Sequence, residues 1–171
     1  MIPDGAELLA VRSYRGEREV AIYGVAHLLP VNPRKTPKRR RKLVSRIYGH
    51  HSVGEGADGF RGLYNSARYS VREKARGIAH AVQPYTGWAS TTPDLDAEDR
   101  PVFYIGADLE MVTWHTGRAS NRHGAAIAFQ GHLGQRRPTT EQAIVAEVGV
   151  EYLADVFKLP ITTDTLVPHS R

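Results

Sequence analysis

The residues of this 171-residue chain best suited to chemistry are its eight histidines, because imidazole both binds metal ions and transfers protons near neutral pH. Four of them stand at the end of short apolar stretches: His50, His51, His115 and His169. Histidines delivered by distant strand ends can meet at one point, and such a set suits zinc, whose catalytic sites use three protein ligands and keep one position open. The chain has no cysteine, so a metal would be held by histidine and carboxylate. His27, His80 and His132 lack this context and are interpreted as ordinary surface or core residues.

The elements that must position these histidines alternate between strands and helices. Residues rich in β-branched and aromatic types predict strands at 19–25, 43–48, 102–105 and 125–129. Apolar residues spaced by three or four predict helices over 60–82 and from Thr139 to about 158, where Thr139 and Gln142 form a capping box. Residues 83–100, with two prolines and several acids, are predicted to be an exposed loop. The pattern predicts a single α/β domain with a mixed central β-sheet flanked by helices.

Composition and charge limit the classes of partner. With 41% hydrophobic and 24% charged residues the chain is not disordered, and its net charge of +5 and pI near 9.6 suit an anionic partner. No run approaches the roughly 20 apolar residues of a membrane span, so we expect no membrane partner. The acidic start of the chain does not resemble a signal peptide.

A dense basic run lies between the first two predicted strands. It comprises Arg34, Lys35, Lys38, Arg39, Arg40, Arg41 and Lys42. The run is either a solvated loop or a contact with an anionic polymer. Nucleic acid could use the same charges, but no interleaved aromatic residues accompany them, so a nucleic-acid partner ranks lower.

Several segments of residues 43–171 resemble, in order, those of the zinc-dependent N-acetylmuramoyl-L-alanine amidases, the type 2 amidase family that shares its fold with peptidoglycan recognition proteins. The resembling segments are Ile47–Ser52 (IYGHHS), Trp114–Asn121 (WHTGRASN), His123–Gly131 (HGAAIAFQG), Pro138–Gln142 (PTTEQ) and Leu166–Arg171 (LVPHSR). The resemblance implies a single domain of the peptidoglycan recognition/amidase type over 43–171, preceded by an N-terminal strand and basic loop over 1–42.

The resemblance also implies roles for individual residues. His50 would be the first zinc ligand and His169 the second, while His51 would be structural. His115, Arg118 and Asn121 would line the groove that binds the muramyl peptide, and Tyr85 is the candidate for the family's catalytic tyrosine, with Tyr104 as a second candidate. The implied reaction is zinc-assisted hydrolysis of the amide between N-acetylmuramic acid and L-alanine, with peptidoglycan or another anionic wall polymer as partner. The site of action would be the cell wall or periplasm, as for a phage lysin.

One departure from the family leaves a second function open. The family's third zinc ligand, a Cys or Asp after the second histidine, is not found, because the chain ends at Arg171 and its C-terminal end is interpreted as truncated. The alternatives are therefore a zinc amidase and a non-catalytic module of the same fold that binds peptidoglycan. A basic nucleic-acid-binding protein is the weaker third hypothesis.

Overall fold

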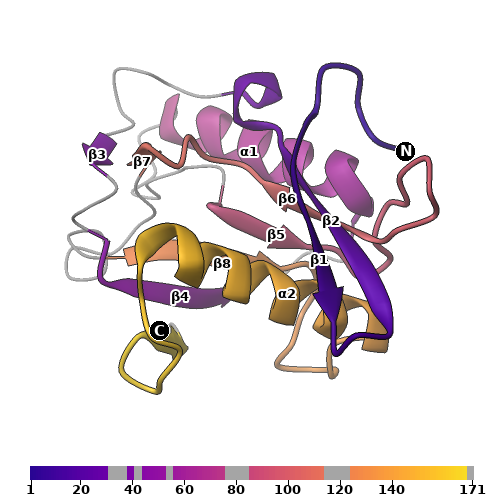
Figure 1. Ribbon diagram of the computed structural model, residues 1–171. Coiled ribbons are helices and arrows are strands. Elements are labelled where there is room, and N and C mark those ends of the chain that lie inside the picture. The colour runs from indigo at the N-terminus through magenta and orange to yellow at the C-terminus, as the bar shows by residue number, and fades with distance from the viewer. Residues whose placement is uncertain (31–37, 41–43, 53–55, 76–84, 114–123, 169–171) are drawn as a thin grey trace.

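The structure is a computed structural model that describes residues 1–30, 38–40, 44–52, 56–75, 85–113 and 124–168. A seven-stranded mixed sheet in the order β1-β2-β6-β5-β8-β4-β9 forms its centre (Figure 1). Its strands are β1 (Glu7–Tyr14), β2 (Arg18–Gly24), β4 (Arg46–His51), β5 (Gly87–Ala89), β6 (Val102–Ile105), β8 (Gly124–Phe129) and β9 (Leu166–Pro168). The predicted mixed sheet flanked by helices is thereby confirmed.

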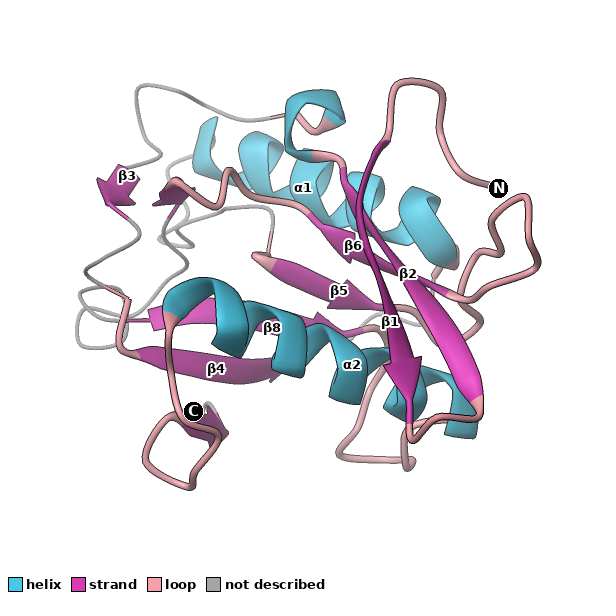
Figure 2. Cartoon of the chain, in the orientation of Figure 1, coloured by secondary structure: helices cyan, strands magenta, loops and turns pink. Residues whose placement is uncertain are grey.

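One helix covers each face of this sheet (Figure 2). Helix α1 (Gly59–Ala75) packs through Leu63 and Ala67 in a core that includes Trp88 and Tyr104. Helix α2 (Thr140–Phe157) packs on the other face, in a core that includes Phe103. α1 is described as far as Ala75, and the rest of the helix predicted over 60–82 lies outside the described residues. No helix in the described ranges is both long and apolar enough to cross a membrane.

The N-terminal part of the chain contributes two strands to the sheet. β2 matches the strand predicted at 19–25, and it runs parallel to β6. β1 was not predicted; it pairs antiparallel with β2 and forms one edge of the sheet. Its residues are mostly half-buried or exposed, so the apolar alternation that marks a strand is weak.

The prediction of an exposed loop over 83–100 is wrong at β5, which lies in the middle of the sheet between β6 and β8. All three β5 residues are buried, and Trp88 is 1% exposed. Three residues are too few to show a strand period, and Gly87 normally signals a turn. Gly87 is needed here because a Cβ at this position would collide with the ring of Phe103.

The start of α2 confirms Thr139 as the N-cap, since its Oγ1 accepts a hydrogen bond from the backbone N–H of Gln142 at 3.1 Å. The reciprocal hydrogen bond of the predicted capping box, from the Thr139 N–H to the Gln142 side chain, is absent. Gln142 is fully buried and its Nε2 donates instead to the carbonyls of Ala89 and Gln130, at 2.9 and 2.8 Å. Ala89 is the last residue of β5, and Gln130 directly follows β8. One side chain of α2 therefore links the ends of two neighbouring strands.

Candidate functional site

The two adjacent histidines of β4 point to opposite faces of the sheet, as alternation along a strand requires. Ile47 packs in the core beneath α2, and His51, four residues on, lies on the same side of the strand. The His51 ring contacts the His132 ring at 5.4 Å, and its Nδ1 accepts from the Leu133 N–H at 3.2 Å. His50 lies on the other face, the one that α1 covers.

On the α1 face, His50 belongs to a row of three aromatic rings. Its ring centroid is 5.8 Å from that of Tyr85, and Tyr85 is 5.9 Å from Trp88. The sheet register explains the row, because His50 pairs with Ala128 and Ala128 pairs with Trp88. Two residues proposed from distant parts of the sequence, His50 and Tyr85, are thus neighbours.

Burial raises the pKa of Tyr85 to about 12, so its phenol is neutral at physiological pH and can donate a hydrogen bond. Tyr104, the second tyrosine candidate, is 1% exposed and donates its O–H to Asp94 at 2.7 Å. Asp94 in turn accepts from the N–H of Phe60 in the first turn of α1, at 2.9 Å. Tyr104 is therefore occupied in the core that holds α1 on the sheet, whereas Tyr85 stands at the edge of that core.

A pocket of about 260 Å³ lies on the same face, between α1 and the ends of the strands. Its lining is polar and aromatic: Ser52, Gly56, Ala57, Gly62, Asn65, Ser66, Tyr69, Trp88 and Gln130. Trp88 belongs both to this pocket and to the row of rings that ends at His50. Hydroxyl and amide groups beside aromatic rings are suited to a ligand with many hydrogen-bonding groups, such as a sugar or a peptide.

The pocket contains one buried acceptor without a partner. Gln130 is 3% exposed, and its Nε2 donates to the carbonyl of Ala57 at 2.5 Å. Its Oε1 is buried and has no hydrogen-bond partner among the residues that the structure describes. An unsatisfied buried acceptor costs about 1–3 kcal/mol of folding free energy. Neither Trp88 nor Gln130 was proposed as a site residue from the sequence, because their place beside the pocket depends on the tertiary fold.

Replacing Gln142 by leucine is expected to lower the free energy of unfolding by about 1–3 kcal/mol, because two buried hydrogen bonds from its Nε2 to strand-end carbonyls are lost. The matched control is Gln135→Leu, since Gln135 is exposed. Urea unfolding of both variants measures the difference. Equal stability of the two variants would show that Gln142 does not hold the strand ends.

The other site residues proposed from the sequence lie outside the described residues: His115, Arg118 and Asn121 of the groove, and the second zinc ligand His169. The strands that lead to them are described. β7 (Met111–Thr113) ends two residues before His115, and β9 ends at Pro168, which is paired with Gly49 of β4.

Imidazole is a ligand that zinc prefers, and His50 offers one at the end of β4. Within the described ranges, no group of three or more His, Asp or Glu side chains could hold a metal ion. His50 is therefore a single described donor, and the other proposed ligand, His169, follows the strand that pairs with β4.

The basic run is described only in its centre. Lys38–Arg40 form β3, which pairs antiparallel with β7 in a separate two-stranded sheet. The other basic residues of the run lie outside the described residues. β7 connects this sheet to the segment that carries the groove residues proposed from the sequence.

Comparison with solved structures gives the same fold for two groups of proteins. The first group includes a complex described as tracheal cytotoxin bound to the ectodomains of peptidoglycan recognition proteins LCa and LCx. The matching chain of that complex is 18% identical to this chain, with a TM-score of 0.61. The match covers 86% of this chain and 83% of that chain. The second group includes the N-acetylmuramoyl-L-alanine amidase LysC from Clostridium intestinale, with 19% identity and a TM-score of 0.55. This match covers 82% of this chain and 80% of that chain.

A third similar structure is the Drosophila peptidoglycan recognition protein SA, with 16% identity, a TM-score of 0.55 and coverage of 77% of this chain and 70% of that chain. No protein-family model and no curated protein sequence matches this chain. At these identities the likeness establishes the fold, which is that of the peptidoglycan recognition proteins and N-acetylmuramoyl-L-alanine amidases. The expected fold type is confirmed.

Proposed function

We propose that this chain acts on peptidoglycan and hydrolyses the amide between the lactyl group of N-acetylmuramic acid and L-alanine. The observation that carries this proposal is the contact between His50 and Tyr85, 5.8 Å apart on the face that also holds the polar pocket. Fold alone does not determine activity, so the proposal depends on these side chains. The shared fold with amidases and peptidoglycan recognition proteins supports the substrate class.

His50 and His169 are the residues proposed to hold a zinc ion. Gly49 pairs with Pro168 in parallel register. We propose that the next residues, His50 and His169, continue this register and that their imidazoles therefore lie close together. A zinc ion bound there would polarise the scissile carbonyl and lower the pKa of a bound water. The amidase resemblance of both segments supports the same pair.

The proposed role of Tyr85 is to donate a hydrogen bond to the oxygen of the scissile amide. Its phenol keeps its proton at physiological pH because burial raises its pKa to about 12. Its position between His50 and Trp88 keeps the ring in one orientation, and a donor fixed in advance is more effective than one that must be ordered during the reaction. His115, Arg118 and Asn121 are proposed to bind the peptide in the groove.

The polar pocket is proposed to bind the sugar or the adjoining part of the peptide stem. Tyr69, which is 54% exposed, offers aromatic surface, and the Gln130 Oε1 lacks a donor among the described residues. None of these groups needs a metal, so the same pocket would also serve a module that binds peptidoglycan without cutting it. The basic run is proposed to contact anionic wall polymer, and the cell wall or periplasm is the proposed site of action of a phage-type lysin.

The test uses the full chain with purified cell walls, with zinc added and with zinc removed by a chelator. We expect the chain to sediment with the walls and to release new L-alanine amino termini only when zinc is present. The matched variant is Tyr85→Phe, which should reduce release and leave sedimentation unchanged. Sedimentation without release would favour the non-catalytic peptidoglycan-binding module. A chain that neither binds walls nor releases amino termini would contradict the proposal.

A further inference from the structure

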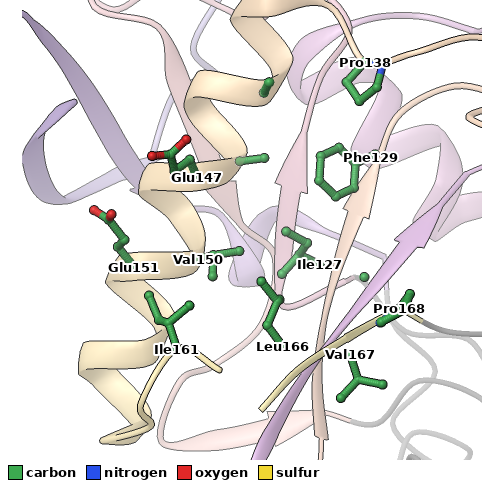
Figure 3. A pocket seen from close by; sticks show the side chains of 13 residues that line it. Ile127, Phe129, Pro138, Glu147, Val150, Glu151, Ile161, Leu166, Val167 and Pro168 are labelled. Carbon is green, nitrogen blue, oxygen red and sulfur yellow. The ribbon is translucent and has the colours of Figure 1, made fainter. Parts of the chain in front are cut away.

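A second and larger pocket lies on the opposite face of the sheet from His50. It has a volume of about 730 Å³ and is bounded by α2 on one side and by β4, β8 and β9 on the other (Figure 3). Its lining residues are Gly49, Ile127, Phe129, Pro138, Ala143, Ala146, Glu147, Val150, Glu151, Ile161, Leu166, Val167 and Pro168. Gly49 lies on the side of β4 opposite to His50, so this pocket and the proposed peptidoglycan site have the sheet between them.

Small residues make the pocket hollow. A Cβ built on Gly49 would have no heavy atom within 4 Å, and the helix presents Ala143 and Ala146 where larger side chains would reach the sheet. Protein interiors are normally close-packed, and apolar surface that stays open at this scale is typical of binding sites. The volume falls in the range of small-molecule pockets, and the lining is apolar apart from Glu147 and Glu151.

The charges on α2 indicate what kind of ligand fits. Three of its acidic residues are ion-paired with arginines of the β1–β2 hairpin: Glu141 with Arg18, Glu147 with Arg15 and Asp155 with Arg12. The fourth, Glu151, lines the pocket, and its carboxylate forms no ion pair or hydrogen bond with any residue of the described ranges. In a chain of net charge +5, this pocket therefore combines an apolar interior with a rim carboxylate that pairs with none of the described residues.

We propose that this pocket is a binding site for a small amphiphilic amine, with the apolar body between α2 and the strands and the ammonium group beside Glu151. The apolar body would cover Ile127, Val150 and Leu166, which face one another across the pocket in Figure 3. The ammonium would remain at the solvent edge, because Glu151 is exposed. An ammonium is thus preferred over a neutral or anionic group on the same apolar chain.

The test compares three probes that share one alkyl chain and differ in charge: octylammonium, octanol and octanoate. Titration calorimetry on the full chain at low salt is expected to rank them in that order, with octylammonium about two- to five-fold tighter than octanol, as an exposed ion pair provides. Added salt should remove that preference and leave the octanol affinity unchanged. Absence of binding by all three probes, or equal binding of octylammonium and octanoate, would overturn the proposal.

Two variants separate the apolar and the charged parts of the site. Gly49→Val should fill the pocket and weaken all three probes, and Ala143→Leu provides a second filling variant if the first does not fold. Glu151→Gln should remove only the preference for octylammonium, while Glu141→Gln, which changes the same charge on the ion-paired Glu141, should keep it. Loss of the preference in both charge variants would mean that net charge, not this site, selects the amine.

Discussion

Under the proposed function, His50→Ala is expected to lower zinc affinity and amidase activity by a factor of at least about 100 each. The activity part follows because metal-assisted polarisation supplies several kcal/mol, and each 1.36 kcal/mol corresponds to a factor of about ten in rate. The affinity part follows because His50 is one of the two imidazoles proposed to hold the ion, and removing a ligand weakens metal binding. Zinc competition with a chromophoric chelator and release of L-alanine amino termini measure the two effects.

The neighbouring histidine provides the matched control. His51→Ala removes the acceptor of the Leu133 N–H on the opposite face, so it should cost about 1 kcal/mol of stability and leave zinc affinity unchanged. Equal loss of zinc in the two variants would show that the face of β4 does not decide which histidine binds the metal. Unchanged zinc affinity in His50→Ala would exclude His50 as a ligand.

The second large effect concerns Phe103, which fills the space between α2 and the sheet. The ring is fully buried, and Phe103→Ala is expected to cost about 3–5 kcal/mol of unfolding free energy. Leu95→Ala, at a position 52% exposed, should change the stability by less than about 0.5 kcal/mol. Urea unfolding curves give both values, and a small effect of Phe103→Ala would contradict the packing described here.

Gly149 of α2 lies against the Phe103 ring, and the direction of the stability change on replacing it by alanine should depend on that ring. A Cβ on Gly149 would lie 2.5 Å from Cε1 and Cζ of Phe103, so Gly149→Ala should destabilise the chain by about 1–3 kcal/mol although alanine favours a helix. In the Phe103→Ala background the collision is gone. There the same substitution should stabilise by about 1 kcal/mol, the difference in helix propensity. The same sign in both backgrounds would show that the ring does not require this glycine.

The parts of the fold with strong local signals were predictable from the sequence. Helix α2 carries its own N-cap in Thr139 and a long apolar pattern, and β6 and β8 are apolar runs of ordinary strand length. β5 was missed because its three residues gain their stability from neighbouring strands and from Phe103, not from a local pattern. β4 was predicted at 43–48 but spans Arg46–His51, so both histidines lie within the strand rather than directly after it.

Individual residues of the candidate site could be predicted from the sequence, but their arrangement in space could not. A histidine at the end of an apolar strand is a local signal, and it drew attention to His50. That Tyr85 and Trp88 would lie beside it depends on the pairing of β4 with β8 and of β8 with β5, a tertiary arrangement that no local pattern specifies. The unsatisfied Gln130 Oε1 depends on the fold in the same way, because it is defined by what surrounds the side chain.

The most direct test of the central claim, that the α1 face of the sheet binds peptidoglycan, is an NMR titration of the full chain with a muramyl tripeptide. It needs neither bound zinc nor turnover. The chain has two tryptophans, so a Trp88→Phe variant assigns the Trp88 indole N–H, which donates to Ser90 Oγ at 3.1 Å. We predict saturable shifts of this indole signal and of the His50 and Tyr85 rings. No shift at these three residues, or shifts confined to the pocket beneath α2, would contradict the claim.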